Sequence, residues 1–533
     1  MSGAKRGPNQ RGPQVLFYAV PARIRLKELV CRLVGACGLH ELPAQRRHCT
    51  YLDTFDRAIL QTDGVLIYLE SEQDKHLLWR GQGRLQASLP IESQPRMADD
   101  LPPSRVGREL AKRMGIRALL PLLQTRQSLR RFVKLDDEDK TLLRLDLIDE
   151  SVDHKRPHRY LAVESMIGYP KALKDLRDGL ARCGCRPLPR DPSHDLFTDA
   201  DVATQPAPPW NDYQLLPGER ADVAARLILG KLRQEMQRNL DGTLKDLDSE
   251  FLHDFRVSVR RTRSLLGQIK GVFPQRRLQR FSEAFAWLGS ITGPTRDLDV
   301  YLLTLPDYQA RLPSQQGEAL GALRDYLVQH QKSEQRALAK LLGGARYKKL
   351  MDDWGVFLAE PPPLRSHLPN AALPVVEVAG RRIWKLFRRV IREGRAISAQ
   401  SPPEDLHELR KSCKKLRYLL EFFKGLYPEA DIKLLVAELK QLQDNLGDYQ
   451  DLAVQQASFE GFRGGMEKEA MLTERVDAAL VHLVELLAER EAEVRKEFDE
   501  HFRRFEAKPV RRLFASLFKP SKADSPEDAQ QVE

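Results

Sequence analysis

The sequence predicts a multidomain protein in which an α+β domain precedes an all-α domain built from helical bundles. The chain has 533 residues, more than one ordinary hydrophobic core supports. Between about Val15 and Leu188, short β-rich runs alternate with helical stretches. From about Gly218 to Phe505, apolar residues recur at helical spacing and β-rich runs are missing. This change of periodicity predicts two folded units of different architecture.

Each element of the first domain follows from a local pattern. Residues 1–14 are polar, basic and rich in glycine and proline, which predicts a disordered arm. The α+β domain is expected over 15–189, with strands at 64–69, 129–134, 141–148 and 159–163 and helices at 24–34, 105–114 and 170–182. Seven prolines between Pro187 and Pro217 then predict a linker over 190–217.

Composition narrows the class of protein. The chain has 86 Lys plus Arg against 75 Asp plus Glu, a formal net charge of +11, and 42% hydrophobic residues. No stretch approaches the roughly 18 uncharged apolar residues of a membrane span, and the first residues lack the apolar core of a secretory signal. The six cysteines and twelve histidines show no metal-type spacing. We expect a cytoplasmic protein with reduced thiols, no metal, no cofactor and no membrane partner.

The helical region contains an internal repeat. The segment LHDFRVSVRRTRSLLGQIKGVFP, from Leu252, realigns with LHELRKSCKKLRYLLEFFKGLYP, from Leu406, at an offset of 154 residues. A duplicated pair of bundles, about 150 residues each, is the simplest account. We expect a helical domain over 218–507, with repeats over about 218–365 and 372–507 and a basic-then-acidic tail over 508–533. The same offset pairs two further residue types: Gly293 with Gly447 and Asp297 with Asp451.

Each copy of the repeat places a histidine and three cations along one edge of a helix. At 100° per residue the four side chains fall within a stripe of roughly 80°, beside the apolar stripe that faces the core. The two stripes consist of His253, Arg256, Arg260 and Arg263 in the first copy, and of His407, Arg410, Lys414 and Arg417 in the second. As the alternative, each histidine is a helix-start residue bonded to a carboxylate. Asp297 and Asp451, each after a glycine turn, are expected to cap or tether a helix.

A third basic stripe precedes the second copy. Its cations follow a spacing of 4, 3, 4 and 3 residues: Arg381, Lys385, Arg388, Arg392 and Arg395. Like charges at helical spacing repel one another by a few tenths of a kcal/mol per pair, and a bound polyanion would remove that penalty. A solvated surface helix is the alternative for any single basic run. Nucleic-acid readers interleave stacking aromatic residues with their cations, and these stripes contain almost none, so a phosphate chain without bases fits better.

The duplicated motif resembles the CHAD family, the conserved-histidine α-helical domain. The pattern L-H-[DE]-x-R-x-S-x-[RK]-[RK]-x-R occurs twice, and each copy is followed by a Lys-Gly-x-[FY]-Pro end and a Gly-x-x-x-Asp-Leu turn, over about residues 215–510. The resemblance implies two four-helix bundles that bind inorganic polyphosphate through basic residues, and a place on polyphosphate granules. Carried over by position, the ligands would be the eight residues of the two stripes together with Arg381, Lys385, Arg388 and Arg392.

The first domain is similar to the CYTH triphosphate tunnel family. The matching segments are YLDTFDRAILQTDGVLIYLE from Tyr51, HLLWRGQG from His76, with Arg80 in place of a lysine, and RLDLIDES from Arg144. The E-x-E-x-K signature, whose carboxylates hold Mg²⁺ in that family, should lie near VLFYAVPA, which contains no acid or lysine. We therefore expect a catalytically silent tunnel or a closed scaffold, with cations left at Arg80, Arg126, Arg130, Arg131 and Arg144.

Three functions follow from these patterns. A polyphosphate-binding protein without enzymatic activity is favoured. A Mg²⁺-dependent inorganic triphosphatase in the first domain is the second reading, and the missing E-x-E-x-K motif argues against it. Non-specific nucleic-acid binding is the third, and it follows from charge alone. No catalytic residue and no metal ligand are assigned.

Overall fold

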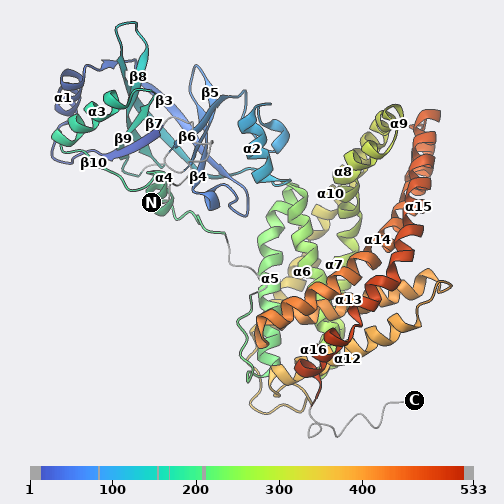
Figure 1. Cartoon of the computed structure of the whole chain (residues 1–533). Helices are drawn as coiled ribbons and strands as arrows, with labels where there is room; N and C mark the ends of the chain where they lie inside the picture. Colours follow the sequence, from blue (N-terminus) through green and yellow to red (C-terminus); the bar gives the residue numbers. More distant parts are fainter. Residues whose placement is uncertain (1–13, 82–83, 153–154, 167, 207–211, 521–533) are drawn as a thin grey trace, which may run out of the picture. The chain divides into compact units, whose positions relative to one another are not determined.

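The computed structural model describes residues 14–81, 84–152, 155–166, 168–206 and 212–520. It divides into two compact units, Met1–Ala207 and Pro208–Glu533 (Figure 1). The first unit is α+β and the second consists of helices, which confirms the predicted order of the two domains. The disordered arm expected over 1–14 lies almost entirely outside the described residues.

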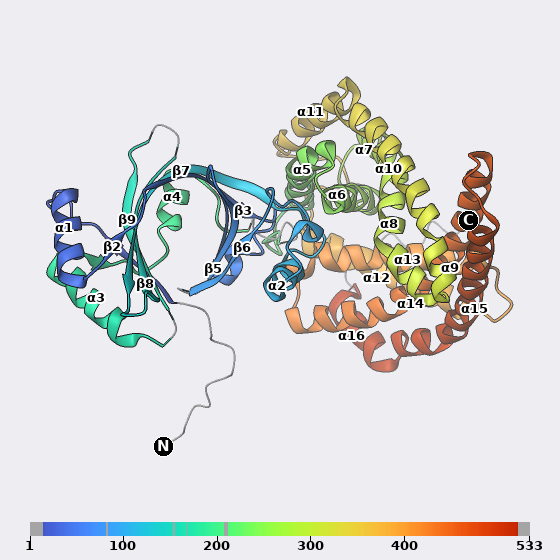
Figure 2. The same cartoon turned by 90° about the horizontal axis from the view of Figure 1, so that it is seen from above.

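The N-terminal unit is built on an antiparallel sheet that curves back on itself (Figure 2). The sheet order is β10-β1-β6-β5-β4-β3-β7-β8-β9, and β2 pairs with β7. The first strand pairs with β9 along its length and with β6 at Gln14 and Arg84, so the ring of strand pairings closes. The strands are β1 (Gln14–Ala19), β2 (His40–Glu41), β3 (Gln45–Asp53), β4 (Gly64–Glu70), β5 (Lys75–Gly81), β6 (Arg84–Pro90), β7 (Leu120–Leu135), β8 (Thr141–Ser151), β9 (His158–Ser165) and β10 (Arg186–Pro187).

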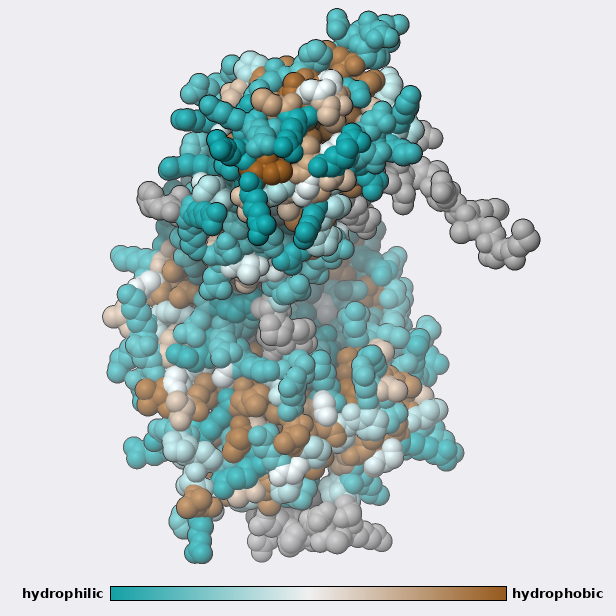
Figure 3. Space-filling view, turned by 90° about the vertical axis from the view of Figure 1, so that its left-hand side faces the viewer, coloured by the Kyte–Doolittle hydropathy of each residue, from teal (hydrophilic) through white to brown (hydrophobic). Residues whose placement is uncertain are grey.

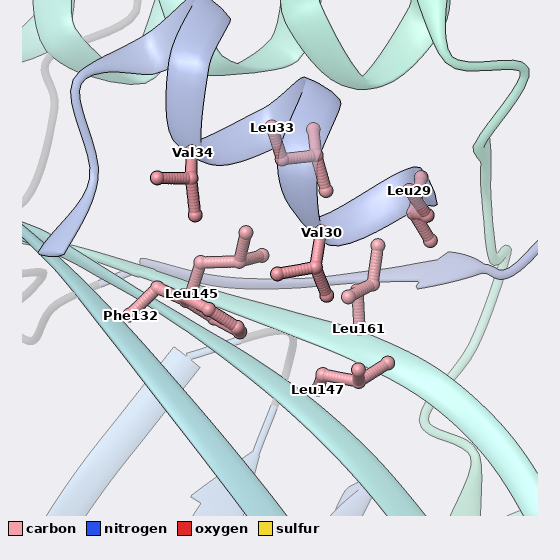
Figure 4. Close-up of a pocket in the computed structure, with 8 residues that line it drawn as sticks. All are labelled: Leu29, Val30, Leu33, Val34, Phe132, Leu145, Leu147 and Leu161. Carbon is pink, nitrogen blue, oxygen red and sulfur yellow. The ribbon is translucent and has the colours of Figure 1, made fainter. Parts of the chain in front are cut away.

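Three helices cover the outer face of this sheet. They are α1 (Leu26–Cys37), α2 (Arg105–Met114) and α3 (Pro170–Arg182), at the three predicted places. The apolar side chains of α1 point at leucines of β8 and β9 (Figure 4), and the space between them is lined by apolar residues only. This space is a packing gap in a core, not a ligand site.

The other face of the sheet packs against a short helix that the sequence did not predict. Residues 190–217 were expected to be a linker, yet α4 (Ser193–Asp199) forms within them. Its Leu196 and Phe197 are fully buried, and the Phe197 ring meets Tyr51 of β3 edge to face with ring centroids 5.2 Å apart. The linker prediction is therefore wrong for this segment, because two apolar side chains fill the interior of the curved sheet.

The second unit consists of helices that form two groups. The first group holds α5 (Ala221–Lys245), α6 (Ser249–Gln268), α7 (Gln275–Ile291), α8 (Gly293–Arg311), α9 (Ser314–Ala319), α10 (Gly321–Leu342) and α11 (Ala345–Ala359). The second group holds α12 (Val375–Ala396), α13 (Pro403–Phe422), α14 (Glu429–Lys468), α15 (Glu474–Phe505) and α16 (Lys508–Phe518). Helices α6 and α13 pack against each other where the groups meet (Figure 2).

The helix starts follow the offset found in the sequence. Helices α12, α13 and α14 begin at residues 375, 403 and 429, each 154 residues after the starts of α5, α6 and α7 at 221, 249 and 275. The second half of the pattern differs, because α14 runs unbroken through Gly447 where a turn was predicted. Pro294, the second residue of α8, lacks the amide hydrogen that would continue α7, whereas the matching position in α14 is Asp448.

The last helix corrects the prediction of a tail over 508–533. Helix α16 packs Val510, Phe514 and Phe518 into the second group, and the ring of Phe514 stacks on Phe387 of α12 with centroids 3.9 Å apart. Residues 521–533 lie outside the described part of the chain. No helix among the described residues is long and apolar enough to cross a membrane, and hydrophilic side chains cover most of the face in Figure 3.

Candidate functional site

Helix α6 presents the first basic stripe. The side chain of Asp248 caps the helix by accepting hydrogen bonds from the backbone amides of Glu250 and Phe251, at 2.9 and 3.3 Å. Phe255 and Val259 are fully buried in the core, which fixes the rotation of the helix. The adjoining edge then turns Arg260 and Arg263 to solvent, while His253 and Arg256 are half-buried.

Helix α13 presents the second basic stripe in the same way. Leu409, Cys413 and Leu416 are fully buried. The edge beside them carries His407, which is exposed, and three half-buried cations, Arg410, Lys414 and Arg417. The structure therefore orients both predicted stripes away from the core.

The two stripes meet where α6 contacts α13. Arg260 of α6 and Lys414 of α13, which hold matching positions in the repeat, are close enough for their charges to interact. The pKa of Lys414 falls to about 8, first because burial disfavours its charge and then because of the neighbouring cations Arg410, Arg260 and Arg417. Nearby Asp451 opposes this shift. The cations of the two helices thus form one cluster.

A buried ion pair joins the two helices beside this cluster. Arg261 Nη2 of α6 lies 2.5 Å from Glu421 Oε2 of α13, and the guanidinium stands over the ring of Tyr418 at 5.4 Å. Arg261 is nine-tenths buried, so the pair holds the helices together in a water-poor environment.

Each inner arginine lies against a glycine of a neighbouring helix, at a distance where a Cβ atom would make an ordinary van der Waals contact. A Cβ atom at Gly293 would lie 3.6 Å from Arg256 Nη1, and one at Gly447 would lie 3.8 Å from Arg410 Nη2. Arg256 Nη1 donates hydrogen bonds to the hydroxyl of Thr292 (2.9 Å) and the carbonyl of Gly289 (3.2 Å). The same glycine–arginine contact therefore recurs in both copies.

Two carboxylates border the cluster. Arg410 Nη2 lies 2.8 Å from Asp451 Oδ1. Asp297 faces Arg256 and Arg296 without a hydrogen bond to either among the described residues. Burial raises its pKa and these two arginines oppose the rise. Neither aspartate caps a helix, since both lie inside α8 and α14, and Asp451 acts as a tether between α13 and α14.

The histidines lie at the edge of the cluster and have different partners. Nδ1 of His407 is 2.9 Å from Oε1 of Gln450, an amide instead of a carboxylate. His253 has a lowered pKa, first because it is partly buried and then because of the charge of Arg296. Arg296 and Gln450 are again 154 residues apart. Sequence reasoning missed Arg296, although its place beside Asp297 in the repeated turn was a usable signal.

Buried donors in the cluster lack partners. Within the described part of the chain, the Nε atoms of Arg256 and Arg410 are buried and make no hydrogen bond, whereas Arg417 Nε pairs with Glu421 Oε1 at 3.5 Å. Arg260, Arg263 and Lys414 form no ion pair among the described residues. A cluster of cations with unused donors is suited to binding several oxygens of an anion, because each hydrogen bond to a charged oxygen is charge-assisted.

The basic stripe on α12 lies apart from this cluster. Its residues Arg381, Lys385, Arg388 and Arg392 are exposed, on the side of α12 opposite its buried residues. Two cations of the stripe are paired with acids: Arg381 with Glu377 at 3.2 Å and Arg395 with Glu506 at 2.8 Å. Lys385, Arg388 and Arg392 have no ion-pair partner in the described ranges. The structure therefore separates the predicted ligands into two surfaces.

The interior of the N-terminal sheet holds a carboxylate that is saturated with hydrogen bonds. Glu150 is fully buried and accepts hydrogen bonds from four side chains at 2.5 to 2.8 Å: Tyr51, Thr125, Gln127 and Tyr160. All four donors come from strands of the same sheet. This network satisfies the carboxylate inside the sheet with hydrogen bonds from the protein itself.

Four of the five cations expected in this domain pair with acids of the same unit, and the fifth, Arg126, is exposed. The pairs are Arg80 with Asp191 (3.2 Å), Arg130 with Glu41 (2.7 Å), Arg131 with Asp146 (2.7 Å) and Arg144 with Glu164 (3.2 Å). A cavity of about 390 Å³ beside Arg80 is lined by Val15, Phe17, Asp63, Asp191 and His194 among others. Among the described residues, no three His, Cys, Asp or Glu side chains come together as a metal ion requires.

Comparison with known proteins follows this geometry. The helical unit is a pair of helix groups with a cationic cluster at their junction. Residues 227–460 match the model of the family described as the CHAD domain. The chain therefore carries a CHAD domain, and the resemblance found in the sequence is confirmed.

Three relatives illustrate the likeness. An uncharacterized protein of Mycobacterium tuberculosis (strain CDC 1551 / Oshkosh) is 28% identical over 213 residues, which is 38% of this chain and 38% of the relative. The CHAD domain of the plant Ricinus communis is 25% identical, with a TM-score of 0.46, over 54% of this chain and 93% of that chain. A Hippeastrum protein with a dominant triphosphatase activity is 16% identical, with a TM-score of 0.28, over 36% of this chain and 97% of that chain.

Proposed function

We propose that this protein binds inorganic polyphosphate at the junction of α6 and α13 and thereby associates with polyphosphate granules in the cytoplasm. One observation carries the proposal. The repeat places matching cations, Arg260 and Lys414, close enough for their charges to interact, and the inner arginines Arg256 and Arg410 keep unused buried donors. A chain of phosphates offers closely spaced oxygens to all of them at once.

The ligand set is the two basic stripes: His253, Arg256, Arg260, Arg263, His407, Arg410, Lys414 and Arg417. The two histidines lie at the edge, and His253, whose pKa is lowered by burial, becomes a ligand when a bound anion favours its charged form. An ancestral duplication accounts for the constant offset between matching helices. The exposed cations of α12 serve as a second contact for a long chain.

The alternatives have less support. A triphosphatase in the N-terminal unit needs carboxylates free to hold Mg²⁺, and the acids near the interior cations are occupied by arginines or by hydrogen bonds. We infer a closed scaffold without enzymatic activity. Nucleic acid would satisfy the charges, but the stripes present no aromatic surface for bases.

The test is binding of long-chain polyphosphate to the full chain across a salt series. The variant Arg256→Ala/Arg260→Ala/Arg410→Ala/Lys414→Ala should bind about a hundredfold more weakly, since four charge-assisted contacts are lost. The control removes four exposed cations from α10 and changes the net charge equally: Arg324→Ala/Lys332→Ala/Arg336→Ala/Lys340→Ala. Circular dichroism checks that each variant is folded.

The outcomes distinguish polyphosphate binding from nucleic-acid binding and from triphosphatase activity. Binding that is steeply salt-dependent in the parent and the control, but lost in the cluster variant, supports the proposal. If the cluster variant binds as tightly as the parent, the stripes are structural. Equal losses in both variants mean that only net charge matters, and displacement of polyphosphate by DNA at equal phosphate concentration then identifies nucleic acid as the partner. Metal-dependent phosphate release from tripolyphosphate would revive the triphosphatase.

A further inference from the structure

Each copy of the repeat sets a carboxylate of its own against its inner arginine. In the second copy the contact is direct, with 2.8 Å between Arg410 and Asp451, and Asp451 is 60% exposed whereas Arg410 is only 16% exposed. In the first copy Asp297 acts on Arg256 through charge alone, because Arg256 Nη1 donates to Thr292 and to the carbonyl of Gly289. The cluster of cations on α6 and α13 is therefore bordered by carboxylates that compete with a bound anion.

We propose that Asp297 and Asp451 determine specificity by excluding short phosphate anions while admitting long polyphosphate chains. This inference rests on the proposed function and names the length of substrate that the site selects. Orthophosphate and tripolyphosphate are rejected, and chains long enough to reach cations beyond the two aspartates are accepted.

The competition follows from the position of the carboxylates. Asp451 is held beside Arg410 by the packing of α13 on α14, so its effective concentration there is far above that of any free anion. A short anion places all of its charge near Arg410 and Lys414, where it meets the repulsion of Asp451 and must separate an existing ion pair. Screening confines this repulsion to about 8 Å at physiological salt.

A long chain escapes this repulsion because other cations are available to it. Arg260 and Arg263 belong to α6, are exposed and form no ion pair with an acid among the described residues. A chain that binds these residues keeps most of its affinity even while the pair of Arg410 and Asp451 stays closed. The additional contacts of a long chain thus replace the contact with Arg410 that Asp451 blocks.

The two copies should differ in strength. Asp451 must release a hydrogen-bonded arginine, whereas Asp297 only lowers the field at Arg256, whose hydrogen bonds go to Thr292 and Gly289. Removing the carboxylate of Asp451 should therefore relax the length requirement more than removing that of Asp297. This order distinguishes a local competitor from a general effect of net charge.

The experiment measures dissociation constants of orthophosphate, tripolyphosphate and long-chain polyphosphate for the full-length parent, Asp451→Asn and Asp297→Asn. The matched control is Asp241→Asn on α5, which also breaks an exposed aspartate–cation pair, with Lys245 at 2.9 Å, and changes the charge equally. For Asp451→Asn we expect about tenfold tighter tripolyphosphate binding, the effect of one charge contact in a partly buried site, and less than about threefold for the long chain. Asp297→Asn should give about threefold for tripolyphosphate, and Asp241→Asn no change.

Three results would overturn the inference. Equal gains for Asp451→Asn and Asp241→Asn would show that only net charge acts. Weaker binding of every ligand by Asp451→Asn would show that the aspartate positions Arg410 for binding. Equal gains at all chain lengths would show competition without length selection. Failure of the parent to bind the long chain would refute the proposed function itself. This result comes from the parent alone and does not depend on the variants.

Discussion

Lys414 should make polyphosphate binding depend on pH between pH 7 and pH 9, a range in which few side chains titrate. Its pKa is lowered to about 8 by burial and by the cations Arg410, Arg260 and Arg417. In the free protein, Lys414 is therefore charged at pH 7 and about nine-tenths neutral at pH 9. The charged groups that act on it are Arg410, Arg260, Arg417 and the Asp451 carboxylate.

The magnitude follows from proton linkage. A bound phosphate chain returns the pKa of Lys414 toward its ordinary value of 10.5. Binding above pH 8 must then take up one proton, and the affinity falls as the pH rises. Between pH 7 and pH 9 this single group weakens binding by about tenfold.

The assay is titration of long-chain polyphosphate at pH 7, 8 and 9 and constant ionic strength. Lys414→Arg keeps the charge at all three values, so its affinity should change by less than about twofold. The matched control is Lys411→Arg, at an exposed lysine paired with Glu408 at 2.7 Å, which should retain the tenfold fall of the parent. If Lys414→Arg weakens with pH as steeply as the parent, Lys414 is not the titrating group and the reasoning fails.

Three further predictions concern stability, measured by urea unfolding of the full chain. Gly394→Ala should destabilise the helical unit by about 1–3 kcal/mol, because its Cβ would lie 1.9 Å from Phe502, whereas Gly461→Ala, with open space around it, should be neutral or stabilising. Glu150→Leu should cost about 3 kcal/mol or more in the N-terminal unit, since it strands four hydrogen-bond donors, and an unchanged transition would contradict the network. Phe514→Ala should cost about 3–5 kcal/mol, and a loss below 1 kcal/mol would mean that α16 is dispensable.

Patterns carried by one helix were predictable from the sequence. The core face and the cationic edge of α6 and α13 follow from spacing alone, because a helix fixes the angle between successive side chains. The repeat added what spacing cannot, namely that Arg260 and Lys414 hold matching positions. Nothing local indicated that the charges of the two would interact, since this depends on how α6 packs on α13.

Features that depend on a distant partner were missed. The linker prediction failed at α4 because proline-rich composition conceals a seven-residue helix whose Leu196 and Phe197 are stabilised by the curved sheet. The glycine turn held at Gly293, where a proline follows, and failed at Gly447, where an aspartate follows. The pairing of Arg410 with Asp451 crosses two helices and required their coordinates.

The interaction of the matching residues Arg260 and Lys414 affects the direction in which a linear ligand can bind. A site whose two halves present nearly the same groups from opposite sides has no preferred direction, so a linear chain can enter it either end first. Polyphosphate is identical from both ends and gains from this freedom, because both orientations make the same contacts. A nucleic-acid strand has a 5′ and a 3′ end, and reversing it changes which atoms meet each side chain. The repeat thus gives the site no preferred direction, and the proposed ligand has none either.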